Sequence, residues 1–392
     1  MVPADVVVVG GGCTGTSIAW QLARGGAGRV VLLEREGLAA GATGRSSAVV
    51  RQHYVLEPLA RMAWHSLRVL EQFADIVGGD AGLRRVGFLA LFGPRDTVAV
   101  TANVAMQQRV GIETYLLSPD EVRSLEPRLA HEDVSAAAWE PRSGYADPVA
   151  VTYGYAAAAR RHGADLRVGV TAHRLVTGSQ GVEAVETDRE TFATRIVVVA
   201  AGYRSAALLQ PLGVHLPLRP VRHTVAILQR TPAFGPPHPV VSDRICGAYY
   251  RPEGNTLTLV GATAAFEGHD DPEVEVDRAP PLDEVETLAQ RFCRRFPTQA
   301  AAGVRRGYTG VYDCSPDLQP ILGPVPGIPG LYVAAGFSGH GFKLSPAVGE
   351  LLAEQILHGR TTLVDLDLFS VARFAAGRPL RADHPYSVAT LG

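Results

Sequence analysis

Apolar residues along the chain fall into short continuous runs separated by longer amphipathic stretches. Residues 5–9 are an aspartate followed by four valines, and residues 29–34 and 195–202 are similar runs, as expected for strands buried on both faces of a parallel sheet. Between the first two runs, residues 16–24 carry apolar side chains on one face of a helix. The start of the chain therefore predicts a β-α-β unit, the building block of a helix-covered parallel sheet.

The same periodicities predict three more helices and another buried strand. Apolar residues three and four positions apart predict a helix over 59–77, and an Asp-Pro pair opens a helix over 147–159. Residues 330–336 are expected to form a buried strand. A final helix over 345–357 is expected to begin at its Ser-Pro pair, with the serine as N-cap and the proline in the first turn.

The chain between these segments has a different pattern, with short strand-like stretches broken by proline and glycine. Residues 87–92, 224–228, 248–251 and 256–261 are such stretches, and they predict antiparallel pairing. We therefore expect a second layer inserted twice into a nucleotide-binding domain. The expected boundaries are 1–85, 141–217 and 304–375 for the nucleotide-binding domain, 86–140 and 218–303 for a substrate-binding domain, and 376–392 for a C-terminal tail.

A glycine pattern joins the first strand to the first helix. Gly10, Gly12 and Gly15 fit G-x-G-x-x-G, which alone is weak evidence in a chain with 42 glycines. Here the pattern follows a predicted strand and opens a helix, and Glu34 ends the next strand, 19 residues after Gly15. In that context the glycines admit a pyrophosphate to the helix N-terminus, and the carboxylate accepts hydrogen bonds from a ribose. The sequence thus predicts an ADP-containing dinucleotide without a 2′-phosphate.

Composition narrows the range of partners. Lys and Arg number 37 against 39 Asp and Glu, so the formal net charge of −2 does not favour nucleic acid or an anionic membrane surface. Four widely spaced cysteines without CxxC argue against disulfides and a metal site. With neither a signal sequence nor an apolar span, we expect a cytoplasmic protein. Of the 37 basic residues only Lys343 is a lysine.

Further segments extend the glycine fingerprint into a recognisable series. They are residues 42–47, 51–54, 200–202, 306–317 and 336–346, and they resemble the D-amino-acid oxidase and sarcosine oxidase (glycine oxidase-like) superfamily of FAD-dependent amine oxidoreductases. The resemblance covers essentially the whole chain. It implies an α/β fold, in which an FAD-binding Rossmann-like domain of the glutathione-reductase type carries an inserted antiparallel-sheet substrate domain. No second nucleotide fingerprint follows, so the electrons are expected to come from an organic substrate.

The resemblance assigns FAD contacts to several segments. The fingerprint and the loop after the second strand would hold pyrophosphate and ribityl, Val170 would contact adenine through its backbone, and the glycine-rich turn before the last helix would lie under the isoalloxazine ring. The expected cofactor residues are Gly10, Gly12, Cys13, Thr14, Gly15, Glu34, Arg35, Thr43, Arg45, Ser46, Ser47, Val170, Ala201, Gly202, Gly336, Gly339, His340, Gly341, Phe342 and Lys343. For the two serines, ordinary loop capping is the alternative.

The resemblance also implies a substrate site. Arg51 and Lys343 fall where sarcosine oxidases clamp the substrate carboxylate, and a lone lysine in an arginine-rich chain fits a position that rejects a bulky guanidinium. His53, His223 and His340 could take a proton from a substrate amine, and Tyr54 and Tyr250 could project their hydroxyls into the pocket. For these histidines and tyrosines, a role in packing is the alternative.

Two positions depart from the sarcosine oxidase pattern. Gly310 stands where the monomeric enzymes attach the flavin to a cysteine, so the FAD is expected to be non-covalent. Residues 256–260 lack the lysine that those enzymes use to activate oxygen, so the acceptor could be O2 or another compound. Residues 308–317 are more like the heteromeric relatives, which is compatible with partner subunits.

The expected activity is FAD-dependent oxidation of an amino acid, with a secondary or N-substituted amine as the favoured substrate. Hydride transfer to flavin N5 would give an imine that hydrolyses. Two alternatives stay open. One is an FAD-dependent oxidase or dehydrogenase of a 2-hydroxy acid, and the other is a flavin-carrying subunit of a heteromeric amine dehydrogenase.

Overall fold

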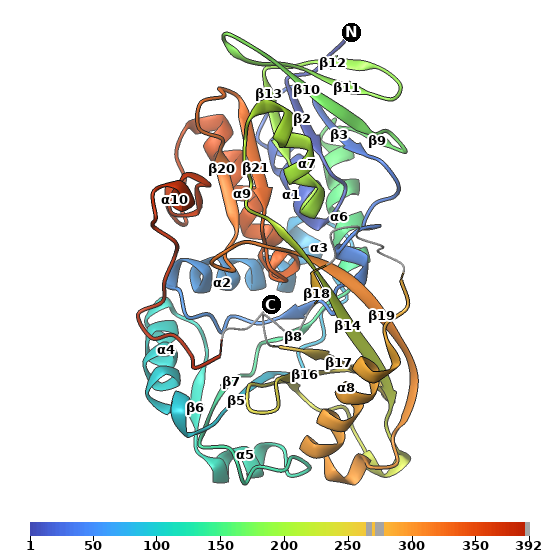
Figure 1. The fold of residues 1–392 in the computed structure, drawn as a ribbon, viewed down its shortest axis with the longest axis vertical. Coiled ribbons are helices and arrows are strands. Elements are labelled where there is room, and N and C mark those ends of the chain that lie inside the picture. The colour runs from blue at the N-terminus through green and yellow to red at the C-terminus, as the bar shows by residue number, and fades with distance from the viewer. Residues whose placement is uncertain (264–268, 271–277, 389–392) are drawn as a thin grey trace.

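Two large sheets organise the chain, one above the other in Figure 1. The structure is a computed structural model that describes residues 1–263, 269–270 and 278–388. A six-stranded sheet forms the upper part and a nine-stranded sheet the lower part, and a four-stranded sheet and a two-stranded ribbon complete the strands. Among the described residues, no helix combines the length and the apolar character needed to cross a membrane.

The six-stranded sheet confirms the parallel strands predicted from the valine-rich runs. Its order is β20-β21-β13-β2-β3-β9, and all neighbours are parallel except β20 and β21. The strands are β2 (Val6–Val9), β3 (Val30–Glu34), β9 (Asp165–Val168), β13 (Ile196–Val199), β20 (Ile321–Pro324) and β21 (Leu331–Ala335). β2 is a central strand, between β13 and β3. The glycine fingerprint that follows it therefore lies midway along the row of carboxyl ends of the parallel strands.

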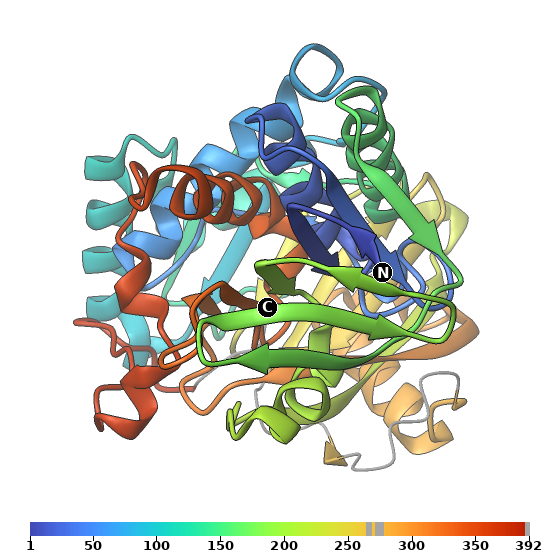
Figure 2. The ribbon, with the colours of Figure 1, turned by 90° about the horizontal axis from the view of Figure 1, so that it is seen from above.

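Different layers cover the two faces of this sheet, as Figure 2 shows from above. Val6 and Val8 pack with a helical layer, whereas Val7 and Val9 pack with the four-stranded sheet. Side chains alternate along a strand, so four consecutive valines fill both cores. The covering helices are α1 (Cys13–Arg24), α6 (Pro148–Arg161) and α9 (Gly341–His358), and the covering strands are β1 (Val2–Pro3), β10 (Ala172–Gly178), β11 (Gly181–Thr187) and β12 (Thr191–Ala193).

Close contacts fix where two of these helices begin. α1 and α9 pack against each other, and a Cβ added at Gly349 of α9 would lie 2.2 Å from Ser17 Oγ of α1. The start of α1 approaches the preceding turn as closely, since a Cβ at Gly15 would lie 1.9 Å from Gly10 O. Any larger residue would push the backbones apart. The two glycines therefore hold both helix N-termini near the end of β2.

The nine-stranded sheet contains the antiparallel strands expected for a substrate-binding layer. Its main order is β18-β14-β17-β16-β15-β5-β7-β6, and only β15 and β5 pair in parallel. The strands are β5 (Phe88–Phe92), β6 (Tyr115–Leu117), β7 (Ala136–Glu140), β14 (Arg219–Gln229), β15 (Val240–Asp243), β16 (Ala248–Glu253), β17 (Leu257–Ala262) and β18 (His269–Asp270). The separate ribbon pairs β4 (Val49–Val50) with β8 (Gly144–Tyr145).

A long strand connects the two parts of the molecule. β19 (Gly303–Cys314) pairs with β14 along nearly its whole length, from Gln229 opposite Gly303 to Arg219 opposite Cys314. The sequence-based boundary placed residues from 304 onward in the nucleotide-binding domain. By its pairing, β19 is instead a strand of the lower sheet. Its carboxyl end reaches the upper part of the molecule, where Cys314 and Phe337 form an isolated antiparallel β-bridge.

The predicted helices exist, but their limits differ from those expected. The helix expected over 59–77 begins at Glu57 and is interrupted at Gln72, which gives α2 (Glu57–Glu71) and α3 (Phe73–Ile76). The remaining α-helices of the described residues are α4 (Thr97–Val110), α5 (Pro119–Leu125), α7 (Ser205–Leu209), α8 (Leu282–Arg295) and α10 (Ala372–Ala375).

The start of α9 differs most from its prediction. The helix begins at Gly341 instead of at Ser345, and Pro346 lies inside it. Burial of Phe342 and Leu344 outweighs the Ser-Pro signal, since a proline this near the N-terminus removes only one early hydrogen bond. The extra turn directs the N-terminus of α9 toward the edge where α1 begins.

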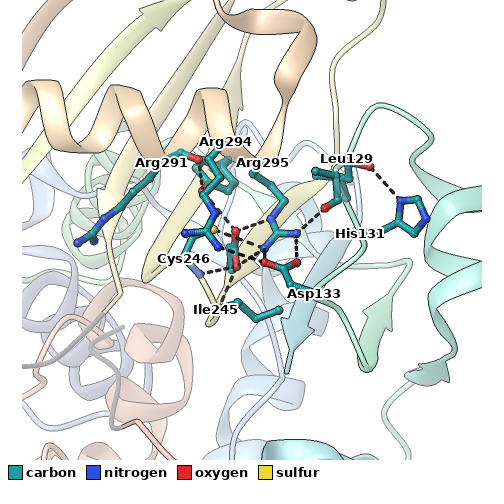
Figure 3. A network of polar contacts seen from close by, with 11 residues as sticks. Leu129, His131, Asp133, Ile245, Cys246, Arg291, Arg294 and Arg295 are labelled. Atoms are coloured by element: carbon teal, nitrogen blue, oxygen red, sulfur yellow. Dashed lines mark hydrogen bonds and ion pairs between the residues drawn. The ribbon is translucent and has the colours of Figure 1, made fainter. Parts of the chain in front are cut away.

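A buried ion pair fastens α8 to the lower sheet (Figure 3). The Arg295 side chain is 1% exposed; its Nε donates to Asp243 Oδ2 at 2.6 Å and its Nη1 donates to Asp133 Oδ1 at 2.8 Å. Asp243 itself is 0% exposed. The hydroxyl of Tyr250 joins the network, 3.0 Å from the carbonyl oxygen of Arg291 and 3.4 Å from Asp243 Oδ2. These contacts hold α8 against β15.

Arg295→Met is expected to lower the free energy of unfolding by about 3–5 kcal/mol, because it leaves the buried Asp243 carboxylate without its cation. Arg294→Met is the matched control, since the Arg294 side chain is 69% exposed and its loss should change stability by no more than about 0.5 kcal/mol. Urea unfolding followed by circular dichroism measures both variants. Equal stability of the two would contradict a structural role for the Arg295–Asp243 pair.

Candidate functional site

A groove of about 570 Å³ runs along the carboxyl ends of the parallel strands. Its walls come from the ends of β2, β3, β13 and β21 and from the first turns of α1 and α9. Most of the expected cofactor residues line it, namely Gly10, Gly12, Cys13, Thr14, Glu34, Arg35, Thr43, Ser46, Val170, Ala201, Gly202, Gly339, Gly341 and Phe342. This edge of an open parallel sheet is where ligands bind.

The glycine fingerprint has the geometry of an anion site. Gly10 has a φ of +117°, a conformation that favours glycine, and there the chain turns from β2 toward α1. Gly12, the N-cap of α1, has no side chain, so it caps none of the N–H groups of the first turn. Thr43 closes the turn by accepting a 3.2 Å hydrogen bond from Cys13 N. The helix end thus offers donors and positive potential to a pyrophosphate.

Glu34 sits beside this turn at the end of β3. Its Oε2 accepts a 2.7 Å hydrogen bond from Gly11 N, and its Oε1 accepts one of 2.7 Å from Glu36 N. Its backbone carbonyl accepts a 2.9 Å hydrogen bond from Val170 N. These hydrogen bonds fix the Glu34 carboxylate beside the fingerprint turn and tie Val170 to the end of β3, and both residues line the groove.

The turn between β21 and α9 forms another wall of the groove. The buried Asp313 carboxylate, at the end of β19, accepts a 2.7 Å hydrogen bond from Gly336 N, and burial raises the pKa of Asp313 to about 6. Ser338 N donates to the Asp313 carbonyl at 3.2 Å. Because α9 begins at Gly341, its first-turn N–H groups, up to Lys343, have no partner within the helix. A second helix N-terminus therefore meets the groove at the end expected to hold the isoalloxazine.

A second cavity, of about 450 Å³, continues from this end of the groove. The two spaces share Ser46, Tyr312, Gly339 and Phe342. The structure brings four expected substrate residues together in the cavity wall: Arg51, His53, His340 and Lys343. Side chains that the sequence did not single out complete the lining, among them Arg244, Tyr249, Thr263, Tyr312 and Tyr386.

Buried cations dominate the charge of this cavity. The Lys343 residue is 5% exposed, and within the described part of the chain its ammonium group has no hydrogen bond or ion pair. Burial, and then the charge of Arg51, lower the pKa of Lys343 well below its usual value. The Arg51 guanidinium lies 4.5 Å from the centroid of the Tyr54 ring and donates a hydrogen bond to the carbonyl oxygen of His53. An anion bound here would offset the repulsion between the two cations.

The two histidines differ in their contacts. His340 is buried, and neither of its ring nitrogens has a hydrogen-bond partner in the described structure. Burial, then the charges of Lys343 and Arg51, lower the pKa of His340 well below its usual value, so its ring is neutral. His53 is engaged on both sides, 3.2 Å from Gln107 Oε1 and 2.7 Å from the Tyr386 hydroxyl. Of these two histidines, His340 therefore has ring nitrogens available to a substrate. His223 also has a ring nitrogen without a partner among the described residues, but it stacks on Tyr249 and Tyr312 and does not line the cavity.

The placement of Tyr250 in the pocket was wrong. Its side chain is fully buried in the core of the lower sheet, next to Asp243, and does not line the cavity. The preceding residue, Tyr249, lines the cavity instead, with its hydroxyl 2.6 Å from Ser47 Oγ. Side chains alternate faces along β16, so an error of one residue exchanged core for cavity. A Cβ at Gly261, opposite Tyr249, would lie 2.4 Å from the Tyr249 ring, so this glycine makes room for it.

Some expected cofactor residues lie outside the groove. Gly15 packs behind the fingerprint turn, Gly336 supports the second turn, and Ser47 lines the cavity instead of the groove. Arg45 donates to the carbonyl oxygen of Ala40 and lines a separate surface groove. Arg45 thus braces the loop that carries Thr43 and does not face the groove itself.

The sequence contained a signal for only part of what it missed. Tyr312 lies two residues from Gly310 along β19, so strand alternation would have placed it on the same face as the position where the related enzymes attach flavin. Arg244 and Tyr386 have no such local signal. They reach the cavity because the lower sheet and the end of the chain fold around it.

The residues present fit FAD. Two helix N-termini supply N–H donors along the groove, and the Glu34 carboxylate stands beside the first of them. FAD would be held by the fingerprint, Thr43 and Glu34 at its nucleotide half and by the turn before α9 at its flavin half. The cavity with Arg51 and Lys343 opens at that flavin half, so a substrate there would have access to the ring.

Comparison with known proteins agrees with this geometry. The profile of the FAD dependent oxidoreductase (DAO) family matches residues 5–355. Human mitochondrial dimethylglycine dehydrogenase is 28% identical over 386 residues, which cover 93% of this chain and 44% of that protein. Sarcosine oxidase subunit beta of Arthrobacter sp is 27% identical over 384 residues, which cover 95% of this chain and 91% of the subunit. The chain thus spans under half the length of the mammalian dehydrogenase.

Solved structures show the same fold over the whole chain. L-proline dehydrogenase from P. horikoshii superposes with a TM-score of 0.87 at 28% identity, covering 97% of this chain and 100% of that one. Glycine oxidase from Geobacillus kaustophilus gives a TM-score of 0.81 at 25% identity, covering 95% of this chain and 99% of that one. The α/β fold expected from the sequence, with a Rossmann-like FAD domain, is confirmed.

FAD is expected to leave the protein intact on acid denaturation. Gly310 offers no nucleophile, Cys314 lines neither space, and burial raises the pKa of the Cys13 thiol, which keeps it protonated. The test is to precipitate the holoprotein with acid and to compare flavin absorbance in the supernatant and the washed pellet. Flavin that stays with the pellet would contradict non-covalent binding.

Proposed function

The chain belongs to the FAD dependent oxidoreductase family, and from this premise we propose that it oxidises an amino acid whose nitrogen is a secondary or N-substituted amine. The substrate carboxylate binds Arg51 and Lys343, which line one cavity at the flavin half of the FAD groove. Relatives named for dimethylglycine and for sarcosine, both N-methylated amino acids, support this substrate class.

One observation carries the proposal: Lys343 is buried in the cavity without an anionic partner among the described residues. A buried cation is costly unless it is paired and hydrogen-bonded. Arg51 is near enough to lower the pKa of Lys343, and an anion bound beside Lys343 would offset this repulsion. A carboxylate suits both, since an arginine fork and a lysine point charge together can bind its two oxygens.

The nitrogen of the substrate needs a proton acceptor, because only the neutral amine carries the free electron pair that drives oxidation. His340 fills this role in the proposal, since it lines the cavity, its ring is neutral, and both ring nitrogens are without partners. When bound, FAD supplies the acceptor for a hydride from the carbon next to the nitrogen. Water then hydrolyses the imine product.

We also propose that the chain works with partner subunits. The support is its similarity to a sarcosine oxidase subunit, which it matches over 91% of the subunit's length. Purified alone, the chain should still bind FAD through its own groove. Anaerobic bleaching of that flavin by an amine shows whether the chain can use the substrate without partners.

Lys343→Arg is expected to impair flavin reduction although it keeps the charge, because the planar guanidinium needs a different geometry from the compact ammonium. Arg51→Ala and Lys343→Met should each weaken substrate binding by about 2–5 kcal/mol, since each leaves a buried carboxylate partly unpaired. The measurement is anaerobic stopped-flow reduction by a series of N-methyl amino acids, with the Kd taken from the concentration dependence.

The control for this experiment is Arg378→Ala, which removes an exposed cation that lines neither the cavity nor the groove and should leave reduction unchanged. The matched 2-hydroxy acids are tested beside the amines, because the same clamp would bind their carboxylates. Reduction by the hydroxy acids alone would overturn the amine assignment. Wild-type rates and affinities in both Lys343 variants would overturn the clamp.

Binding of an unreactive carboxylate such as propionate is expected to weaken as the pH rises. In the free protein the pKa of Lys343 is lowered, and a bound carboxylate raises it again, so binding takes up a proton. The carboxylate therefore binds with full affinity below the pKa that Lys343 has in the free protein. Above that pH the affinity falls by up to about tenfold per pH unit, until the pH reaches the pKa that Lys343 has in the complex. Flavin difference spectra measure the Kd, and Lys343→Met should abolish the slope. A slope that persists in Lys343→Met would assign the proton to another group.

Reoxidation of the reduced protein by O2 is expected to be slow. Ala262, the last residue of β17, and the following Thr263 line the cavity, and neither side chain is a cation. The only lysine of the chain is already in the carboxylate clamp. Stopped-flow mixing of the reduced protein with oxygen, compared with an artificial acceptor such as a phenazine, gives the two rates. Rapid oxygen reaction in both wild type and Lys343→Met would contradict this expectation.

A further inference from the structure

The last described residues of the chain form one wall of the substrate cavity. We call residues 380–388 the C-terminal strap. Figure 1 shows it descending from α10, beside the upper sheet, to α4 in the lower part of the molecule. The strap residues that line the cavity are Leu380, Arg381, Ala382, Pro385, Tyr386 and Val388. Among the described residues, none of the strap lines the FAD groove.

Hydrogen bonds anchor the strap to both parts of the molecule. At its start, Leu380 N donates to Asp317 Oδ2 at 2.9 Å. Near its end, Ser387 N donates to Asp96 Oδ1 at 2.6 Å, and the Ser387 hydroxyl donates to Asp96 Oδ2 at 2.9 Å. Between them, Asn103 Nδ2 of α4 donates to a strap carbonyl at 3.0 Å. The strap is therefore held in place on both sides of Tyr386.

Tyr386 projects from the strap into a stack of side chains at the cavity wall. Its ring centroid lies 4.7 Å from that of Phe92 and 5.9 Å from that of His53, with the His53 ring inclined by only 16°. The Arg244 guanidinium lies 4.3 Å from the Tyr386 centroid on the same wall. These contacts give the ring one position.

A chain of hydrogen bonds orients the Tyr386 hydroxyl. Gln107 Nε2 donates to the Tyr54 carbonyl at 2.9 Å, which leaves Gln107 Oε1 as an acceptor for His53 Nδ1 at 3.2 Å. His53 is neutral, because burial and then the charges of Arg51 and Arg244 lower its pKa to about 3. Its Nε2 therefore accepts a hydrogen bond from the Tyr386 hydroxyl, at 2.7 Å. The strap is thereby coupled to the segment that carries Arg51.

We propose that Tyr386 is a specificity-determining residue whose ring limits the size of the group attached to the substrate's carboxylate-bearing carbon. The inference rests on the proposed function, in that Arg51 and Lys343 bind the carboxylate. A carboxylate fixed there lies in a cavity that Tyr386 helps to close, and the ring cannot retreat because both sides of the strap are anchored. Because no described strap residue lines the FAD groove, changes at Tyr386 should act on the substrate and not on FAD.

The test compares N-methyl derivatives of glycine, alanine, leucine and phenylalanine in anaerobic flavin reduction. Tyr386→Leu, which shortens the wall, should raise the ratio of kred/Kd for the largest to the smallest amine by about tenfold or more over wild type. Tyr386→Trp should shift the ratio the opposite way. Asp383→Ala, an exposed strap residue that does not line the cavity, is the matched control and should keep the wild-type ratio. FAD content of each variant is measured first.

Binding of unreactive carboxylates of increasing size, from acetate to phenylacetate, is measured by flavin difference spectra in the same variants. If amines reduce the flavin but the size ranking is the same in wild type, Tyr386→Leu and Tyr386→Trp, the specificity role is overturned and the proposed function stands. If no amine reduces the flavin but the carboxylates show a ranking that depends on residue 386, the proposed function fails and the role of Tyr386 stands. If no amine reduces the flavin and the carboxylates do not bind, both are overturned.

Discussion

The packing of α1 against α9 is the constraint on which the site depends. Each helix begins just after a strand of the same parallel sheet, and the contact between Gly349 and Ser17 holds them together at backbone distance. Both N-termini therefore meet one groove, one at each half of the expected dinucleotide. A residue bulkier than Gly349 or Ser17 at this contact would push the two helices apart. The N–H donors at their N-termini would then no longer meet in one groove.

The long pairing of β14 with β19 places the second sheet relative to this groove. β19 runs from the lower sheet to the turn before α9, where Asp313 binds Gly336 and Tyr312 lines both the groove and the cavity. One strand thus supplies a wall of the substrate cavity and a support of the flavin turn. Through it, the antiparallel sheet covers the place where the electrons would be exchanged.

Burial acts on two basic side chains with opposite results. Arg295 is buried against Asp243 and Asp133, so its charge is satisfied within the protein and serves stability. Lys343 is as well buried, but its neighbours in the cavity are Arg51 and the neutral His340. The folded protein tolerates this arrangement at a cost in free energy, and under the proposed function a bound carboxylate would recover part of that cost.

The sequence by itself determined the parts of the protein that depend on local order. The valine-rich runs, the glycines with Glu34 at its fixed spacing, and the isolated Lys343 identified the sheet, the nucleotide groove and a charged site, because strand burial and helix-end geometry are set by neighbours in the chain. Only the tertiary structure decided which of Tyr249 and Tyr250 faces the cavity, because strand register depends on pairing with other strands.

The tertiary structure also decided where α9 begins and which residues complete the cavity wall. Burial of the turn at Gly341 extended the helix past its Ser-Pro signal, and this brought its first-turn N–H groups to the groove. Arg244 and Tyr386 lie at opposite ends of a long stretch of chain, and nothing near them in sequence indicates that they meet. Such contacts depend on how complete elements pack, and packing is decided by the sum of many weak contacts across the fold instead of by the order of residues at one place.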